Sequence, residues 1–484
     1  MTKEGLQRPV LWAGAALEAV LDLPEGSAPP VRGVSIDSRT LQPGDLFIAL
    51  SGDDDPRYRG ASGSGRDGHD FVTAARAAGA AAALVAHGHG ENASFEAAAA
   101  AAAAPDDGFR ALGVDDPFDA LWTLARAARA RTAAPVFAIT GSSGKTTAKA
   151  MLTAALTAAL GPPHAAEGSL NNHIGVPLSL ARMPQDAVAA VFEIGMNSPG
   201  EIAPLAKLVH PQIALVLNVL PVHLEGLGSL EAIRREKLSI AVGLGEQGTL
   251  VVHDAVGLES VALPARVLRF GRADDADVRL LDGLEDQTAS VRLLLPDGVT
   301  LDAGALADGP HRRLTACAVI AMLSAAGIDP APALRALADA ELPPGRGRIL
   351  QAGGVALIDD SYNANPESVR QAIVGALEHP GGRRFALLGD MLELGAEAPA
   401  LHAGLAEACG GLDAVFCVGP LARFLHDALP GTRRGGWWPD CTTLPLAEIA
   451  ERLRPGDVLL VKASNRLFWK HGTVAALRSL LDAA

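Results

Sequence analysis

The sequence predicts an α/β protein of three domains, and three observations lead to this fold class. The 484 residues are enough for two to four domains, at about 150 residues per domain. From Val136 onward, unbroken apolar segments alternate with amphipathic ones, which is typical of mostly parallel sheets covered by helices on both faces. The segment 342–345, Leu-Pro-Pro-Gly, has the composition of a linker. We therefore predict domains over 1–134, 135–342 and 343–484.

The first region is predicted to be a small α/β domain. Short apolar segments predict strands over Val31–Ile36 and Leu46–Leu50. Helical periodicity predicts helices over Phe71–Ala78 and Leu121–Arg131. The polar stretch Asp53–Gly68 predicts a surface loop. The alanine run Ala97–Ala104 fits either a helix or a low-complexity segment.

The second region opens on an apolar strand that enters a glycine-rich loop and a helix. The predicted strands and helices are Val136–Thr140, Thr146–Leu160, Val188–Ile194, Ile213–Val219 and Arg313–Ala326. Between residues 250 and 302 the pattern becomes β, and Asp297-Gly298 predicts a hairpin. The third region alternates four strands with helices, which predicts a second doubly wound, Rossmann-like unit. Those strands are Val355–Ile358, Phe385–Leu388, Ala414–Val418 and Val458–Val461.

Composition argues against several classes of protein. The chain has 41 basic and 55 acidic residues, a net charge of −14, whereas proteins that bind duplex nucleic acid need a basic face. The four cysteines lack the spacing of a disulfide framework or a zinc site. No apolar stretch reaches the roughly 18 residues of a membrane span, and the N-terminus lacks the apolar core of a signal peptide. We expect a cytoplasmic monomer with reduced thiols.

The strongest local signal is the segment 140–147, Thr-Gly-Ser-Ser-Gly-Lys-Thr-Thr, between a strand and a helix. Glycines allow backbone N–H groups to converge on phosphate oxygens, and a helix N-terminus favours negative charge. Lys145 would reach the β- and γ-phosphates, and a hydroxyl would hold Mg²⁺. The loop is shorter than usual, since Ile139 stands where a first glycine is expected. We predict nucleotide binding here, against the alternative of a plain strand–helix turn.

Other polar residues follow predicted strands. Glu193 ends one strand and His223 follows the next, where a doubly wound sheet gathers ligands, so both are candidate Mg²⁺ ligands. A capping acid and a loop histidine are the alternatives. Lys237 lies in a helical context, and from the residues alone a solvated surface lysine is the simpler interpretation. The segment 359–366, Asp-Asp-Ser-Tyr-Asn-Ala-Asn-Pro, could contact ribose or substrate, or could be an ordinary cap and turn.

Together these motifs resemble the Mur ligase family. The similar segments run in order along the chain: 35–50, 67–72, 140–147, 171–178, 192–202, 218–229, 359–368 and 387–395. Asp-Ser-Tyr-Asn-Ala-Asn-Pro at 360–366, with Gly-Asp-Met-Leu-Glu-Leu-Gly at 389–395, most resembles the family member that adds D-alanyl-D-alanine to UDP-N-acetylmuramoyl-tripeptide. The resemblance implies an N-terminal UDP-substrate domain, a central ATP-binding domain and a C-terminal Rossmann-like domain.

The resemblance also implies roles by position. ATP would be bound by Gly141, Ser142, Ser143, Gly144, Lys145, Thr146 and Thr147, and on domain closure by Arg346, Asp360 and Asn363. Two Mg²⁺ ions would be held by Thr146, Glu193, His223 and a carbamoylated Lys237. The UDP substrate would contact Ser35, Ser38, Arg39, Asn171 and Asn172. The D-alanyl-D-alanine site would include Asn365, Lys462 and Ser464, and the catalytic residues would be Lys145, His223 and Lys237.

The chain departs from the family pattern at Ala463, where glycine is usual, and in two further places. Arg312 and Thr315 stand where asparagines are usual, which affects the contacts to adenine. The stretch Arg57–Arg66 resembles an insertion at the rim of the UDP pocket. The alternatives are a sister ligase with another amino-acid substrate, a switch or motor ATPase, and a non-catalytic binding protein. The segment 360–366 argues against the first, the short phosphate loop against the second, and the intact candidate metal set against the third.

Overall fold

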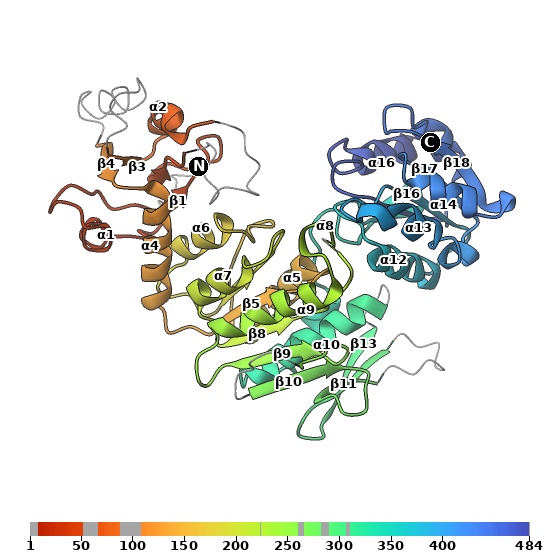
Figure 1. The fold of residues 1–484 in the computed structure, drawn as a ribbon, viewed down its shortest axis with the longest axis horizontal. Coiled ribbons are helices and arrows are strands. Elements are labelled where there is room, and N and C mark those ends of the chain that lie inside the picture. The colour runs from red at the N-terminus through yellow and green to blue at the C-terminus, as the bar shows by residue number, and fades with distance from the viewer. Residues whose placement is uncertain are drawn as a thin grey trace, which may run out of the picture. The chain divides into compact units, whose positions relative to one another are not determined.

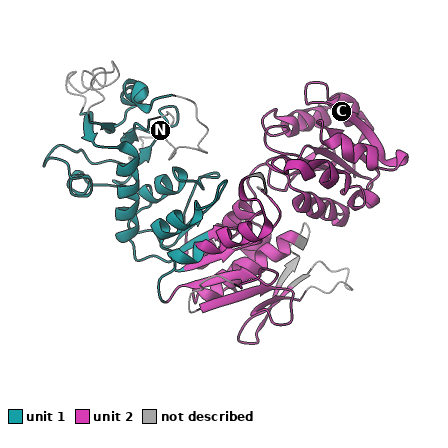
Figure 2. Cartoon of the chain, viewed as in Figure 1, with its two compact units in different colours: residues 1–138, 162–212, 240–246 teal, residues 139–161, 213–239, 247–484 magenta. Residues whose placement is uncertain are grey.

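The computed structural model describes residues 8–51, 66–87, 108–222, 224–259, 266–281, 290–305 and 310–483. The chain forms two compact units (Figure 2). The first comprises Met1–Ala138, Pro162–Gln212 and Ile240–Glu246, and the second Ile139–Gly161, Ile213–Ser239 and Gln247–Ala484. His223, the run Ala97–Ala104 and all of the Arg57–Arg66 stretch except Arg66 lie outside the described residues.

A parallel sheet opens the fold, with the order β1-β2-β3-β4 among the residues described (Figure 1). Its strands are β1 (Gly33–Ser35), β2 (Asp45–Ile48), β3 (Ala82–Ala86) and β4 (Arg110–Val114), with helices α1 (Gly14–Leu21), α2 (Val72–Ala77) and α4 (Pro117–Ala130). Successive side chains of a strand face opposite sides of a sheet. Leu46 therefore packs in the cluster that contains Leu121 of α4, whereas Phe47 packs with Val72 of α2.

The helix α4 begins earlier than its apolar pattern indicated. Asp116 accepts hydrogen bonds from the N–H groups of Phe118 and Asp119, and Pro117 occupies the first turn. A side-chain cap followed by proline is a strong helix start, because it satisfies otherwise unpaired N–H groups and fixes φ. The prediction from Leu121 onward therefore missed the first turn.

The central sheet has the strand order β13-β12-β11-β10-β9-β8-β5-β7-β6 within the described ranges (Figure 1). Its strands are β5 (Val136–Thr140), β6 (His164–Ala165), β7 (Ala190–Glu193), β8 (Ile213–Val216), β9 (Thr249–His253), β10 (Arg266–Gly271), β11 (Val278–Leu280), β12 (Ser290–Leu294) and β13 (Thr300–Ala305). The helices that follow are α5 (Lys145–Leu160), α6 (Gly175–Ala181), α7 (Ile202–Val209), α8 (Leu224–Leu227), α9 (Leu230–Leu238), α10 (Pro310–Ala325) and α11 (Ala333–Ala338).

The predicted hairpin at Asp297-Gly298 is confirmed. Strands β12 and β13 pair antiparallel, and the N–H of Leu295 donates to the carbonyl of Val299 at 2.9 Å. Gly298 has a φ of +83°, a conformation that glycine adopts without a steric penalty. The strands from β8 to β11 pair in parallel, so the hairpin forms an antiparallel edge on a parallel sheet.

The C-terminal sheet has the order β14-β15-β19-β16-β17-β18 and is parallel except for the pair β14–β15. Its strands are β14 (Arg348–Ala352), β15 (Val355–Asp359), β16 (Arg384–Gly389), β17 (Ala414–Val418), β18 (Arg434–Trp438) and β19 (Val458–Lys462). Residues of α12 (Pro366–Glu378) and α14 (Ala422–Ala428) pack in one apolar cluster, and those of α15 (Leu446–Arg452) and α16 (Thr473–Ala483) in another. The helix α13 (Ala398–Ala403) joins the first cluster.

Helices on both faces explain why the strands are apolar without interruption. Leu388 and Leu460 belong to one cluster, and their chain neighbours Leu387 and Leu459 to the other. The predicted α/β class with mostly parallel sheets is confirmed. Within the described part of the chain, no helix is both long and apolar enough to cross a membrane.

Candidate functional site

The loop after β5 has the geometry of a phosphate cradle. Gly144 has a φ of +79°, and a Cβ at this position would lie 3.0 Å from Leu217. The helix α5 then begins at Lys145, and its N-cap residue Gly144 has no side chain to cap the first turn. The ammonium group of Lys145 donates to the carbonyl of Gly141 at 2.9 Å, which folds this side chain back over the loop.

A neighbouring strand end braces this loop. Asn218, just beyond β8, accepts from the N–H of Ser143 at 3.0 Å and donates to the Ser143 carbonyl at 3.1 Å. The hydroxyl of Ser142 donates to the Leu220 carbonyl and accepts from the Leu220 N–H at 2.9 Å. Thr146 is buried and Thr147 is half-buried in the first turn of α5. The predicted loop residues thus lie together, and hydrogen bonds to Asn218 and Leu220 hold Ser142 and Ser143 in place.

Lys237 on α9 is a buried lysine, with 2% of its surface exposed. Burial lowers the pKa of its amine well below the ordinary value, and the positive charge of Lys145 lowers it further. The interpretation as a solvated surface lysine is therefore wrong. A lowered pKa makes the neutral amine easier to form, and the neutral amine is the nucleophilic form of lysine.

A separate polar group in the first unit contains Asn171 and Glu193. Glu193, at the end of β7, is buried, and its Oε1 accepts from the side-chain amide of Asn171 at 2.7 Å. A Cβ on Gly195 would lie 2.9 Å from the Asn171 side chain, so glycine permits this approach. Asn172 accepts from the N–H groups of Ile174 and Gly175, which caps the start of α6. Asn171 therefore orients the Glu193 carboxylate, and Asn172 caps the start of α6.

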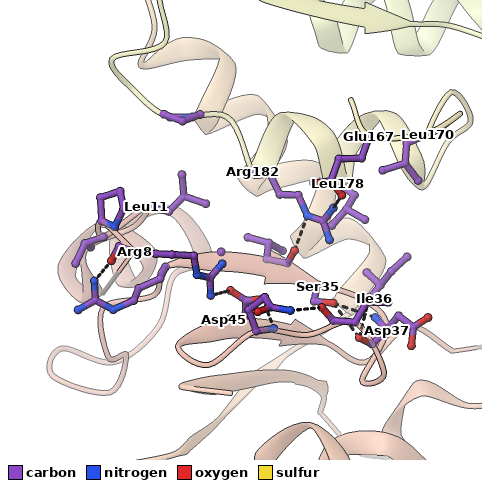
Figure 3. Close-up of a pocket in the computed structure, with 18 of the residues that line it drawn as sticks. Arg8, Leu11, Ser35, Ile36, Asp37, Asp45, Glu167, Leu170, Leu178 and Arg182 are labelled. Carbon is purple, nitrogen blue, oxygen red and sulfur yellow. Dashed lines mark hydrogen bonds and ion pairs between the residues drawn. The ribbon is translucent and has the colours of Figure 1, made fainter. Parts of the chain in front are cut away.

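A large pocket of about 1460 Å³ lies in the first unit (Figure 3). Ser35 lines it together with the arginines Arg8, Arg32 and Arg182. Ser38 and Arg39, predicted for the UDP substrate, are not among its lining residues. Arg39 is 84% exposed, and its guanidinium donates to both carboxylate oxygens of Asp37.

Asp359 anchors the linker to the C-terminal sheet. Its carboxylate accepts from the N–H of Gly345 at 2.8 Å and from the hydroxyl of Ser361 at 2.5 Å. The guanidinium of Arg346 stacks over the ring of Tyr362 at 4.0 Å, a favourable cation–π arrangement. Gly345 has a φ of +74°, and a Cβ there would contact both Tyr362 and Trp469 at 2.9 Å.

The ends of β15 and β19 meet through an ion pair. The ammonium of Lys462 donates to Asp360 Oδ2 at 2.5 Å and to the carbonyl of Asn363 at 2.9 Å. Burial raises the pKa of Asp360, and the charge of Lys462 opposes this shift. The hydroxyl of Ser464 is buried without a hydrogen-bond partner among the described residues. Asp360, Asn363, Lys462 and the Ser464 hydroxyl thus come from neighbouring strand ends, as the parallel topology predicts.

Asn365 has a local structural role in addition to any binding role. Its side chain accepts from the N–H of Ser368 at 2.8 Å, and the Ser368 hydroxyl accepts from the Asn365 N–H at 3.0 Å. This reciprocal pair is a capping box at the start of α12, where Pro366 takes the first position. The cap-and-turn interpretation of the segment 359–366 therefore holds for Asn365.

The segment where the chain departs from the family pattern begins α10. His311 is half-buried, and desolvation together with the charges of Arg312 and Lys462 lowers its pKa to about 4. The hydroxyl of Thr315 donates to the His311 carbonyl within the helix at 2.8 Å. Arg313 pairs with Glu378 of α12 at 3.0 Å.

The arrangement suits chemistry on an anionic, phosphorylated ligand. Backbone N–H groups at the start of α5 and the Lys145 cation can neutralise phosphate charge. Among the described residues, no three His, Cys, Asp or Glu side chains are grouped to hold a metal ion. Mg²⁺ in nucleotide sites takes one or two protein oxygens and completes its shell with phosphates and water. The Thr146 hydroxyl beside the loop and the buried Glu193 carboxylate have the oxygen donors that this ion prefers.

Sequence reasoning missed Asn218 and Arg182. Asn218 could have been found, because a polar side chain ends an otherwise apolar strand segment beside the loop. Arg182 gave no local signal, since it follows an ordinary helix and lies far along the chain from Ser35.

Comparisons with known proteins agree with this geometry. The family model of the Mur ligase middle domain matches residues 139–306, and that of the Mur ligase glutamate ligase domain matches 345–465. The UDP-N-acetylmuramoyl-tripeptide–D-alanyl-D-alanine ligase of Bacillus subtilis (strain 168) is 31% identical over 471 residues, covering 95% of this chain and 96% of the relative.

Two solved structures are similar over nearly the whole chain. MurF from Acinetobacter baumannii aligns with a TM-score of 0.76 and 27% identity, covering 97% of this chain and 99% of its own. MurF ligase from Thermotoga maritima, in complex with ADP, aligns with a TM-score of 0.73 and 27% identity, covering 94% of this chain and 98% of its own.

Proposed function

Because the chain belongs to the Mur ligase family, we propose that it is the ATP-dependent ligase that joins D-alanyl-D-alanine to UDP-N-acetylmuramoyl-tripeptide. The product is UDP-N-acetylmuramoyl-pentapeptide, a precursor of peptidoglycan. The observation that carries this proposal is the match to the Bacillus subtilis ligase across 95% of the chain. The phosphate loop supports the use of ATP, as does the ADP complex of the similar Thermotoga maritima ligase.

The reaction needs activation of a carboxylate, because its oxygen is a poor leaving group and an unactivated carboxylic acid would only transfer its proton to the amine. We propose that a carboxylate oxygen of the tripeptide attacks the γ-phosphorus of ATP, which releases ADP and forms an acyl phosphate. The amine of D-alanyl-D-alanine then attacks the acyl carbon, loses a proton and expels phosphate. Closure of the domains around the acyl phosphate would exclude water, which would otherwise hydrolyse it.

Lys145 and the loop from Gly141 to Thr147 provide the electrostatic part of this catalysis. Negative charge on the transferring phosphoryl group is stabilised by donors that are already oriented before the reaction. The braces from Asn218 to Ser143 support this role, because they hold the loop backbone in place without the ligand. Arg346, Asp360 and Asn363 are proposed to approach the nucleotide from the C-terminal domain.

We assign Mg²⁺ to Thr146, Glu193, His223 and Lys237, with Lys237 carbamoylated. Bound Mg²⁺ would neutralise phosphate charge and orient the transferring group. Lys237 can join the set only as an anion. Its amine would add to CO₂, form an N–C bond and lose a proton, which leaves a carbamate with oxygen donors. The depressed pKa of Lys237 supports this, since the neutral amine is the form that reacts.

The remaining assignments follow the domains proposed over 1–134, 135–342 and 343–484. Ser35, Ser38, Arg39, Asn171 and Asn172 are proposed for the UDP substrate. Asn365, Lys462 and Ser464 are proposed for D-alanyl-D-alanine, a role that the buried Ser464 hydroxyl supports. We propose that the enzyme works in the cytoplasm, because it consumes ATP and because its four cysteines are free thiols.

The test measures phosphate release and product mass with purified protein, ATP and Mg²⁺. UDP-N-acetylmuramoyl-tripeptide and D-alanyl-D-alanine are added singly and together. We expect release to require both and the pentapeptide nucleotide to appear in equal amount. Release that needs neither substrate would contradict the proposal in favour of a plain ATPase. Turnover only with another amino acid would identify a sister ligase instead.

A further inference from the structure

Arg346 directly follows the predicted linker, and its two chain neighbours are fastened to the end of β15. The N–H of Gly345 donates to the Asp359 carboxylate at 2.8 Å, and the Gly345 carbonyl accepts from the N–H of Tyr362 at 3.1 Å. The N–H of Gly347 donates to the Asp359 carbonyl at 2.7 Å. The backbone of Arg346 therefore belongs to the C-terminal sheet and has a fixed place beside β15.

The side chain of Arg346 is held by an aromatic ring rather than by hydrogen bonds. Its guanidinium carbon lies 4.0 Å from the centre of the Tyr362 ring. Within the described parts of the chain, the guanidinium donates to no acceptor and forms no ion pair. The N–H donors of a guanidinium lie in its plane, so a ring that covers its face leaves those donors open. Arg346 is thus half-buried, oriented and open to an anion.

The ring of Tyr362 is supported in turn by Trp469. The centres of the two rings lie 5.4 Å apart with an angle of 69° between their planes, a favourable edge-to-face arrangement. A Cβ on Gly345 would lie 2.9 Å from the Trp469 ring and from the Cβ of Tyr362, so glycine lets the linker backbone approach this aromatic pair. The fold therefore builds the support for Arg346 before any ligand binds.

Arg346 acts electrostatically on the polar residues at the ends of β15 and β19. Burial raises the pKa of Asp360, and the charges of Lys462 and Arg346 both oppose this shift. The Lys462 ammonium already uses two of its three donors, at 2.5 Å to Asp360 and at 2.9 Å to the Asn363 carbonyl. Of these two cations, Arg346 has more open donors in the part of the chain that the structure describes.

We propose that Tyr362 is a positioning residue for Arg346, because its ring holds the guanidinium in the orientation that binds a phosphate group of the nucleotide. The inference rests on the proposed function, in which Arg346 approaches the nucleotide from the C-terminal domain. A long side chain loses conformational freedom when it binds, and a stack that orients it beforehand lowers this cost. A planar guanidinium can also bind two phosphate oxygens at once, provided that its plane is correctly oriented.

The experiment is a double-mutant cycle on the full chain, measured as turnover with ATP, Mg²⁺ and both other substrates. Arg346→Ala removes the cation, and Tyr362→Leu removes the ring but keeps an apolar side chain. Tyr362→Phe keeps the ring and removes the hydroxyl, which has no hydrogen bond among the described residues. Thermal melting of each variant checks the fold.

The matched control is Arg452→Ala, which removes a similar stack at the other end of the same sheet. Arg452 of α15 lies 5.0 Å from the centre of the Phe416 ring. Its carbonyl accepts from Arg383, which precedes β16, whereas Arg346 lies beside the end of the parallel strand β15.

We expect Arg346→Ala to lower kcat by about 100-fold and Tyr362→Leu by about tenfold, with little change in the KM for ATP, because the contact forms only in the closed complex. Tyr362→Phe and Arg452→Ala should have the turnover of the wild type. The double variant should be no slower than Arg346→Ala, because without the cation the ring has nothing to orient.

Three results of the cycle would overturn the inference. The first is wild-type kcat in Tyr362→Leu. The second is a loss in Tyr362→Leu that multiplies the loss in Arg346→Ala, since a purely structural role would be additive in free energy. The third is an equal loss in Tyr362→Phe, which would assign the effect to the hydroxyl.

A further variant, Arg346→Lys, decides the question if Tyr362→Leu does not fold. It keeps the positive charge but loses the planar group that stacks on the ring. We expect kcat to fall by roughly tenfold in Arg346→Lys. Wild-type kcat in this variant would overturn the inference.

Failure of the inference and failure of the proposed function are distinguishable. Pentapeptide formation by the wild type, together with wild-type kcat in Tyr362→Leu, overturns the inference and leaves the function standing. ATP hydrolysis without pentapeptide, slowed non-additively by Arg346→Ala and Tyr362→Leu, supports the inference and overturns the function. A wild-type chain that releases no phosphate from ATP overturns both.

Discussion

The phosphate loop and the arginine pocket present positive charge in two different ways. The loop uses consecutive residues, whose backbone geometry is set by Gly144 and braced by Asn218. The pocket is lined by side chains from residues 8, 32 and 182, which are far apart in the sequence and lie on one pocket because β1 packs against both β2 and α6. One site is therefore built by local conformation and the other by tertiary structure.

This difference sets how each site should respond to substitution. Backbone N–H groups remain when a side chain changes, so the loop should keep binding phosphate unless its conformation is disturbed, although it loses catalysis with Lys145. The pocket presents its positive charge through side chains, so single substitutions there should change the affinity for an anionic ligand directly. Turnover and UDP affinity should thus separate between the two regions.

The largest expected effect is that of Lys145→Ala. Turnover should fall by about 1000-fold, because an oriented charge on the transferring phosphoryl group is lost, while UDP affinity stays unchanged. Steady-state kinetics and calorimetry measure the two quantities. Lys207→Ala, on an exposed position of α7, is the control and should behave as wild type. Turnover near the wild-type value in Lys145→Ala would remove the loop from the active site.

Lys237→Ala should follow, with a loss of roughly 100-fold in turnover. If the missing group is a carbamate, added formate or acetate should restore part of the activity, whereas Lys145→Ala should not respond to either. Thermal melting checks the fold, since the removed side chain is buried. An inactive variant without rescue would argue against the carbamate, and full activity would exclude Lys237 from the site.

Asn218→Ala should have a smaller and more specific effect. It removes both side-chain bonds to Ser143, so the loop becomes less ordered and the KM for ATP should rise about tenfold. Gln212→Ala is the matched control, because Gln212 holds the opposite end of β5 through the N–H of Val136. Equal KM values in the two variants would show that the brace does not order the loop.

The smallest effect on turnover is expected for His311→Gln, which lies in neither anion site. The folded pKa of His311 is about 4 and its ordinary value is 6.5, so in this window the unfolded chain binds the proton first. Stability is therefore lost as the pH falls from 6.5 toward 4, by about 3 kcal/mol at most. Chemical denaturation between pH 6.5 and pH 4 should show that the free energy of unfolding falls less steeply in His311→Gln than in the wild type. An equally steep fall in both proteins would contradict the lowered pKa of His311 in the folded chain.

The same distinction between local conformation and tertiary structure explains which features could be predicted from the sequence. The loop was predictable because a glycine in a left-handed conformation, a lysine and a helix start are adjacent residues. The hairpin at Asp297-Gly298 was predictable for the same reason. Lys237 was misjudged from its residues alone, since helical charge patterns do not reveal burial.

The place of Arg182 in the pocket wall could not be predicted, because its orientation depends on a hydrogen bond to Val34, which lies 148 positions earlier. Arg39 was assigned through resemblance, but its guanidinium binds Asp37, two residues away. Short-range pairing of this kind is not visible in a motif, and the assignment of Arg39 to the UDP substrate stays a prediction.

Isotope transfer can show whether the tripeptide carboxylate is activated as an acyl phosphate. The reacting carboxylate of the tripeptide is labelled with ¹⁸O on both oxygens, and the reaction is run with ATP, Mg²⁺ and D-alanyl-D-alanine. Mass spectrometry of the released phosphate should find one ¹⁸O atom per phosphate, with the other retained in the new amide. Unlabelled phosphate released together with the pentapeptide product would contradict the account.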